Sequence, residues 1–384
     1  MNVKFTLFTL IFISLVHLFS FTSLTINYDN IMNSLCTYTS IGNSKSFTFL
    51  DINLKSQISF TTPRHFDKDA STSKSVIKSD INCNIYSYGI CKCELISDSV
   101  IFENVNFTLH NFNFYLLEKG TNIYDSFAFA FKPETPEQSL THLLYNSKQI
   151  SSLSFGLTSI YNKGGNVYFG GFPDKIRSKH PFNITIPIVL NSNFWEIELY
   201  AITFNKTTKN GNEHLTINQN NKISFQSVHN YIYAPKNIIK YLNNSFFDEL
   251  VTNNICDYHP TLHHFTCDCY AVNDFPQIKF VLTYKRTVLF LGKTLFYDRV
   301  LDNSYCEFLI KENLIDPFNW EIGNAFLENH FVEFNYDTKA ITLLKDIPFE
   351  YILNENNKNI IKNIINFILI INLSWLVVLL ITKK

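Results

Sequence analysis

The chain has 384 residues, which is enough for one large two-lobed unit or for two ordinary domains. Its 32 Lys and Arg residues balance 33 Asp and Glu residues, so no strong positive field is available to hold nucleic acid, and we exclude that partner. Phe (37) and Tyr (20) are abundant, and because aromatic residues favour strands, the composition predicts a β-rich fold.

The N-terminus predicts a secretory signal peptide over residues 1–23. An apolar run extends from Phe5 to Phe19 after Lys4, and small or polar residues follow from Ser20 to Ser23. A basic start, a short apolar stretch and small residues are typical of a cleaved leader. An uncleaved anchor is the alternative.

Between the termini the sequence alternates short apolar strands with turns rich in Asn, Gly, Pro and Ser. One helix is expected from Pro235 to about Leu250, where Pro opens the first turn and apolar residues recur at helical spacing. The expected strands include 47–50, 105–116, 166–172, 195–204 and 278–284. No Pro-rich linker divides this region, so any lobe boundary falls within continuous β structure.

The C-terminus predicts a membrane anchor. A polar stalk (349–363) precedes the apolar segment 364–381, which is long enough to cross the hydrocarbon core of a bilayer, and a short tail (382–384) ends in Lys383 and Lys384. Lysines belong on the cytoplasmic side, so we expect a single-pass type I membrane protein with a lumenal or extracellular body. The alternative is a tail that is removed and exchanged for a lipid anchor.

Eight cysteines lie between these termini, and an even number in an oxidising compartment predicts disulfides. The short loop between Cys256 and Cys267 favours a bridge, and parity pairs Cys83 with Cys91 or Cys93 and Cys36 with whichever remains. The alternative for the Cys- and His-rich stretch 256–269 is a zinc site, but its spacing matches no standard module. We therefore expect neither a metal nor a cofactor. Four glycosylation sequons, at Asn106, Asn183, Asn205 and Asn243, suit a secreted glycoprotein.

Five segments, in the right order, resemble the pepsin-like aspartic proteases (peptidase family A1). They are GGNVYFGGFPDKI (164–176), FWEIELYAITFNKT (194–207), YIYAPKNIIKYL (231–242), the loop from Cys269 to Cys306, and WEIGNAFLENHFVEFNYDTKAITLL (320–344). The resemblance implies an all-β bilobal fold with a few short helices. It also implies lobes at 24–190 and 191–348, a cleft between them and a Cys269–Cys306 disulfide.

The first lobe carries a more divergent resemblance. YTSIGNSKSFTFLDIN (38–53) is similar to the approach to the family's first catalytic loop and places Asp51 at the first aspartate. YGICKCELISDSV (88–100) resembles the flap hairpin, with Tyr88 as the flap tyrosine. DSFAFAF (125–131) resembles the strand that threads the first catalytic loop.

The chemistry of the family needs two carboxylates that share one proton and activate a water, each on an Asp-Thr-Gly or Asp-Ser-Gly loop. Here Asp51 is followed by Ile52 and Asn53. Counting back from Pro235 places Gln226 at the second aspartate, followed by Ser227 and Val228. An amide cannot exchange a proton near neutral pH, and a β-branched residue fits the glycine position poorly.

The sequence therefore predicts a membrane-anchored aspartic protease-like protein that is catalytically impaired and binds a peptide or protein in the cleft between its lobes. The alternative is an active aspartic endopeptidase that uses Asp51 with an unidentified partner. No Asp or Glu lies between Glu213 and Asp248, so His229 is the first candidate for that partner. A third hypothesis is a structural surface glycoprotein whose cleft is filled.

Overall fold

The computed structural model describes most of the body of the chain, and it is mainly β-sheet. The described residues are 23–29, 34–42, 47–85, 89–102, 105, 107–118, 125–160, 164–208, 211–260, 264–282, 287–290, 295–298, 305–327 and 330–345. The expected signal peptide (apart from Ser23), stalk, apolar segment 364–381 and tail lie outside these residues. Among the described residues, no helix combines the length and apolar character that crossing a membrane requires.

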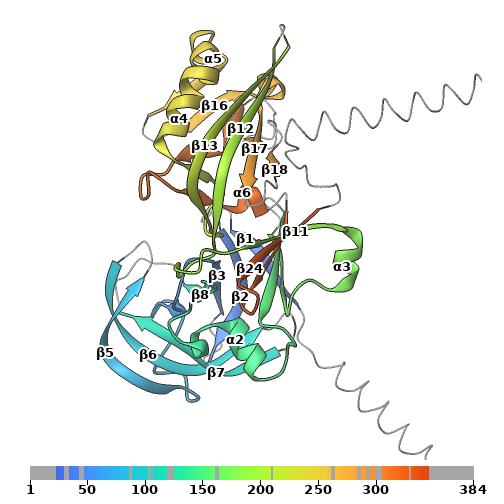
Figure 1. Cartoon of the computed structure of the whole chain (residues 1–384). Helices are drawn as coiled ribbons and strands as arrows, with labels where there is room; N and C mark the ends of the chain where they lie inside the picture. Colours follow the sequence, from blue (N-terminus) through green and yellow to red (C-terminus); the bar gives the residue numbers. More distant parts are fainter. Residues whose placement is uncertain are drawn as a thin grey trace, which may run out of the picture.

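The body consists of two β-rich lobes joined by a shared sheet (Figure 1). The largest sheet builds the first lobe and the junction. Its strand order is β11 (Phe182–Pro187), β24 (Ala340–Lys345), β23 (Phe331–Asn335), β9 (Ser154–Ile160), β10 (Gly164–Phe169), β1 (Ser23–Asp29), β2 (Ser34–Ile41), β3 (Phe47–Asn53), β8 (Ser126–Ala128), β4 (Phe60–Thr61), β7 (Phe107–Leu117), β6 (Gly89–Phe102) and β5 (Ser75–Ile85). The last two strands of the body, β23 and β24, thus belong to the sheet of the first lobe and tie the two halves of the chain together.

Two smaller sheets and short helices build the second lobe. One sheet has the order β18 (Thr287–Phe290), β17 (Gln277–Leu282), β12 (Glu196–Thr208), β13 (Gly211–Phe225), β22 (Trp320–Ile322), β14 (Ile232–Ala234) and β21 (Ile310–Glu312). The other has the order β15 (Cys256–His259), β16 (His264–Asp268), β20 (Tyr305–Phe308) and β19 (Phe296–Asp298). Helix α4 (Lys236–Leu242), a π-helical turn (Asn243–Phe247) and α5 (Asp248–Thr252) follow one another, where the sequence predicts one helix from Pro235. The other α-helices within the described ranges are α2 (Leu140–Asn146), α3 (Asp174–Lys179) and α6 (Asn324–Leu327).

One aromatic cluster packs the junction between the lobes. Trp195 is fully buried, and its ring lies 5.1 Å from Phe334 and 4.8 Å from Tyr336, measured between ring centroids. Its indole Nε1 donates a hydrogen bond of 2.7 Å to the carbonyl of Phe129 in the first lobe. Buried aromatic pairs of this kind add stability beyond the burial of their surface, so the cluster fixes how the lobes meet.

Two of the expected disulfides are confirmed, and both lie in the second lobe. Cys256 is bonded to Cys267, with Cα atoms 4.0 Å apart, and Cys269 is bonded to Cys306, at 5.1 Å. Because Cys267 and Cys269 are both oxidised in these bridges, they have no thiolate with which to hold zinc.

The other two expected bridges are wrong, because none of Cys36, Cys83, Cys91 and Cys93 takes part in a disulfide. The thiol of Cys83 donates to the carbonyl of Cys91 (3.6 Å) and the thiol of Cys93 to that of Ile81 (3.7 Å). Burial raises the pKa of both thiols, which keeps them protonated. Cys36 lies on β2 opposite Asp51, whereas the other three occupy the β5–β6 hairpin. Cys83 and Cys91 are cross-strand neighbours in that hairpin, as Cys256 and Cys267 are on β15 and β16, so parity and proximity do not decide which cysteines are oxidised.

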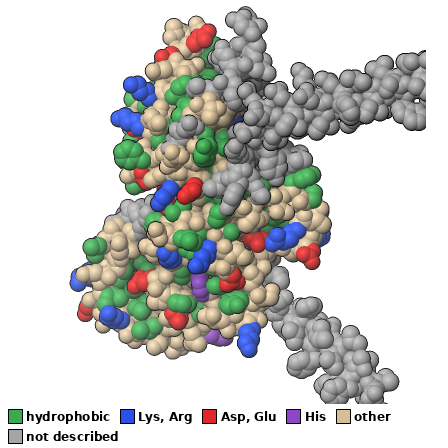
Figure 2. Space-filling model, viewed as in Figure 1, with side chains coloured by type: hydrophobic (Ala, Val, Ile, Leu, Met, Phe, Trp, Pro, Cys, Tyr) green, Lys and Arg blue, Asp and Glu red, His purple; other side chains and the backbone are tan. Residues whose placement is uncertain are grey.

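The surface carries mixed charge. On the face shown in Figure 2, basic and acidic side chains are interspersed among polar and apolar ones, and no large area of a single sign is present. This distribution agrees with the balanced composition of the chain.

Candidate active site between the lobes

Each lobe contributes one loop to the candidate site, and each loop leaves a strand that has a parallel neighbour. In the first lobe β3 runs parallel to β8, with Asn53 opposite Ala128. In the second lobe β13 runs parallel to β22, with Phe225 opposite Ile322, and the amide of Gln226 donates to the carbonyl of Ile322 (2.9 Å). The two loops are therefore built on the same local plan.

A matching hydrogen bond shows which residues of the two loops are equivalent. The carbonyl of Ser56 accepts a bond from the amide of Ala130 (3.1 Å), just after β8. The carbonyl of His229 accepts the corresponding bond from Asn324 (2.8 Å), just after β22. Ser56 follows Asn53 by three positions and His229 follows Gln226 by three, so Asn53 and Gln226 occupy equivalent places.

Both of these residues carry neutral carboxamides whose oxygens face their own loop. The Asn53 Oδ1 accepts bonds from the amides of Lys55 and Ser56, each 3.0 Å long. The Gln226 Oε1 accepts a bond of 2.9 Å from the amide of Ser227. Because all three donors are backbone N–H groups, the atoms that accept must be the oxygens, and this fixes the orientation of both side chains.

The two loops touch at Ser227. Its hydroxyl donates to the carbonyl of Ile52, and its own carbonyl accepts a bond from the amide of Leu35 (3.1 Å). Both partners lie in the first lobe, and Ser227 is fully buried. This contact closes the floor between the lobes and brings the turn at Ile52 and Asn53 against the loop of Gln226.

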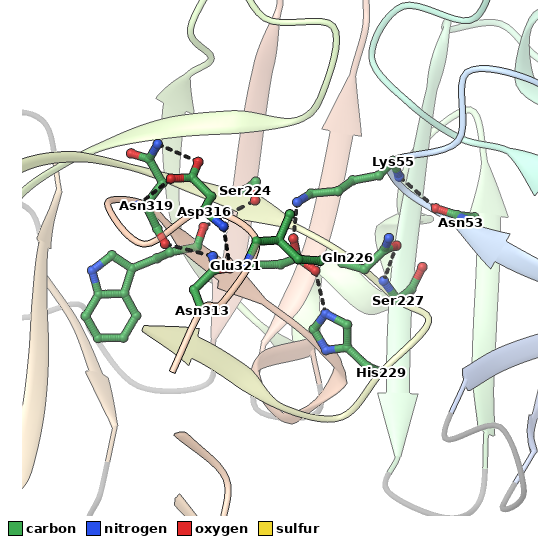
Figure 3. Close-up of polar contacts among 12 residues, drawn as sticks. Asn53, Lys55, Ser224, Gln226, Ser227, His229, Asn313, Asp316, Asn319 and Glu321 are labelled. Atoms are coloured by element: carbon green, nitrogen blue, oxygen red, sulfur yellow. Dashed lines mark hydrogen bonds and ion pairs between the residues drawn. The ribbon is translucent and has the colours of Figure 1, made fainter. Parts of the chain in front are cut away.

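A charged cluster crosses the same floor (Figure 3). Lys55 reaches from the first loop to the second lobe, where its Nζ pairs with Oε2 of Glu321 on β22. The other carboxylate oxygen of Glu321 lies 2.7 Å from Nε2 of His229 in the second loop. The side chains of the three residues are only 6 %, 14 % and 16 % exposed, respectively, so the charges are screened weakly by water.

Glu321 is held ionised in this cluster. Burial by itself raises the pKa of Glu321, but the hydrogen bond and charge of His229, together with the charge of Lys55, more than offset it and bring the pKa to about 2. The carboxylate therefore keeps its negative charge at moderately acid pH.

A comparison with protein families gives this arrangement its context. Residues 44–345 match the family model of the eukaryotic aspartyl protease. The chain belongs to the eukaryotic aspartyl protease family. A comparison with curated proteins finds no significant match.

Within this aspartyl protease fold, Asp51 lies two positions before Asn53 on β3. Alternate residues of a strand point to the same face, so Asp51 and Asn53 share one face, while Ile52 points into the core. Asp51 is 9 % exposed, and its backbone amide donates to the carbonyl of Asp125 (2.9 Å). The role of Asp51 as the first aspartate stays a prediction, and the backbone equivalence favours Asn53 as the residue that faces Gln226. Tyr88, the predicted flap tyrosine, lies outside the described residues.

Neither loop places a residue in the left-handed, positive-φ conformation that a glycine would permit at the third position of the family's motif. Neither Lys55 nor Val228 is among the described residues with a positive φ. The family's loops use glycine two positions after the aspartate, so both loops of this chain have been rebuilt around bulkier side chains.

His229 is enclosed on both sides of its ring. Its Nε2 faces Glu321, and its Nδ1 is buried against Gly323, where an added Cβ would lie 2.4 Å from Nδ1. The ring also meets Tyr233 edge-on, with centroids 4.7 Å apart. Since one nitrogen is engaged and the other is enclosed, this geometry does not support His229 as an acid–base partner for Asp51.

Sequence reasoning missed Lys55 and Glu321. A search for acids along the chain near Gln226 could not find Glu321, because it arrives from β22, almost a hundred residues later. The sequence nevertheless indicated both residues. Glu321 interrupts the apolar pair that is expected before Gly323, and Lys55 lies in a turn where a small residue is expected. A charged residue in an apolar position indicates a partner of opposite charge nearby.

Proposed function

We propose that this protein is a catalytically impaired aspartyl protease that binds a peptide or protein between its lobes. The observation that carries the proposal is the pair of amides, Asn53 and Gln226, at the equivalent places of the two loops. Neither side chain can share or transfer a proton near neutral pH. Loss of a general acid or base typically costs about 10²–10⁴-fold in rate, and here both members of the pair are replaced.

The retained architecture supports a binding role. Both lobes, the shared sheet and the aromatic junction around Trp195 are formed, although the residues that would carry out hydrolysis are changed. A family that recognises peptides along a cleft can keep the recognition surface after its chemistry is lost, because the two depend on different side chains.

The terminal segments support a location at a membrane. We infer that residues 1–23 direct the chain into the secretory pathway and that the apolar segment 364–381 holds it there, with the body on the lumenal or extracellular side. The ligand would then be a secreted, lumenal or surface peptide.

The test asks whether the protein retains peptides without cleaving them. The full chain in detergent is immobilised and exposed to a random peptide library, and the retained peptides are sequenced by mass spectrometry. We expect a defined set of intact peptides. Val228→Trp, in the second loop, should abolish retention, whereas Val251→Trp on α5 should not, because α5 lies at the far end of the second lobe (Figure 1). Retention that survives Val228→Trp, or fragments in place of intact peptides, would contradict the proposal.

A further inference from the structure

We propose that Lys55, Glu321 and His229 form a clasp that locks the two lobes together at the floor of the site, in place of the carboxylate pair. This inference goes beyond the proposed function, because it concerns the free protein and needs no ligand. It would hold even if residual proteolysis were found.

The position of the clasp follows from which lobe supplies each group. Lys55 comes from the loop after β3, whereas Glu321 is on β22 and His229 is in the loop after β13. Both oxygens of the carboxylate are thus engaged, one by each lobe. Tyr233 is the further titratable group facing Glu321, and burial, with the charge of Glu321, raises its pKa, so it stays neutral and adds no competing charge.

Burial makes this cluster different from the ion pairs at the surface. Lys55 is 5 % exposed as a residue, while the pair formed by Lys222 and Glu196 has side chains 46 % and 18 % exposed. Exposed pairs contribute little, whereas removing one partner of a buried pair leaves an uncompensated charge and is strongly destabilising. Separation of the lobes would break the pair of Lys55 and Glu321, whose attraction is screened only weakly in this buried position, so the clasp opposes opening.

The backbone amide of Leu35 can show whether the two lobes are in contact near the clasp. The amide of Leu35 in the first lobe donates to the carbonyl of Ser227 in the second, so it is protected only while the lobes meet. The amide of Ala325 donates to the carbonyl of Asn230, and both of these residues belong to the second lobe. Separation of the lobes should therefore expose Leu35 to exchange and leave Ala325 protected.

The experiment is hydrogen exchange on the full chain, comparing wild type with Lys55→Met. We expect exchange at Leu35 to rise at least about tenfold in the variant, with Ala325 unchanged. Lys222→Met, which removes a lysine from a pair within the second lobe, is the matched control and should change neither amide. Lys55→Arg keeps the charge and should keep Leu35 protected.

Several results would overturn the clasp. They are unchanged exchange at Leu35 in Lys55→Met, an equal rise in the Lys222→Met control, or loss of protection in Lys55→Arg. If Lys55→Met does not fold, Glu321→Gln is the second variant. It removes the carboxylate charge with which Lys55 pairs across the lobes, and an unchanged Leu35 in that variant would likewise refute the clasp.

Discussion

Lowering the pH from 5 to 2 should destabilise the wild-type protein more than a variant in which Lys55→Met and Glu321→Gln are combined. In the folded state the pKa of Glu321 falls from its ordinary value of 4.5 to about 2. The difference is roughly 2.5 pH units, and at 1.36 kcal/mol per unit it corresponds to about 3 kcal/mol of folding free energy.

The direction of the effect follows from the sign of the shift. A carboxyl whose pKa is lowered by folding stabilises the folded state when it is ionised, so its contribution is complete above pH 4.5. The contribution is lost as the pH falls from 4.5 through about 2, where the folded protein must also bind the proton. In the double variant this proton-binding group is absent, and because Lys55 and Glu321 are removed together, neither of these two is left as an unpaired buried charge.

Urea denaturation followed by tryptophan fluorescence measures the effect, since both Trp195 at the lobe junction and Trp320 in the second lobe are fully buried. The free energy of unfolding of each protein is determined at a series of pH values, and the variant is subtracted from the wild type. We expect the difference in the free energy of unfolding to be constant above pH 4.5. Below pH 4.5 it should fall, by at most about 1.4 kcal/mol for each pH unit. The reasoning would be refuted if the free energies of unfolding of the two proteins changed in parallel from pH 5 to 2. It would also be refuted if the difference between them changed only above pH 5.

Three further predictions concern single substitutions. Gly323→Ala should destabilise the fold by about 1–3 kcal/mol, because its Cβ would lie 2.4 Å from the carbonyl oxygen of His229, and an unchanged melting temperature would contradict this close approach. Gln226→Asp alone should not produce cleavage of a peptide library at acid pH, because Asn53 still offers no second carboxylate, and measurable turnover would contradict that reasoning. Asn183 is exposed on β11, so Asn183→Gln should remove one glycan from protein made in a secretory host, and unchanged mobility on a gel would count against glycosylation there.

Much of the fold could be predicted from the sequence, because the features that determine it are local. Alternating apolar residues mark the strands, Pro235 marks the helix that follows it, and the short loop from Cys256 to Cys267 places a disulfide across adjacent strands. The family resemblance supplied the order of these elements and the Cys269–Cys306 bridge.

The centre of the site was harder to predict, because it depends on which residues meet across the two lobes. Asp51 and Asn53 are two residues apart on the same face of β3, so pattern alone cannot decide which of them faces Gln226. The pairing of Lys55 with Glu321 joins residues 266 positions apart, and no spacing rule connects them. The free thiols of the β5–β6 hairpin were mispredicted because an even count of cysteines does not say which neighbouring thiols are oxidised.

Peptide cleavage is the most direct test of the central claim that the chain lacks a working pair of carboxylates. The full chain and its Asp51→Asn variant are incubated at acid pH with a peptide library, with and without pepstatin, and the products are counted by mass spectrometry. We predict no pepstatin-sensitive cleavage by either protein. Robust cleavage by the wild type that disappears in Asp51→Asn would show that Asp51 works with another acid, and it would contradict the account.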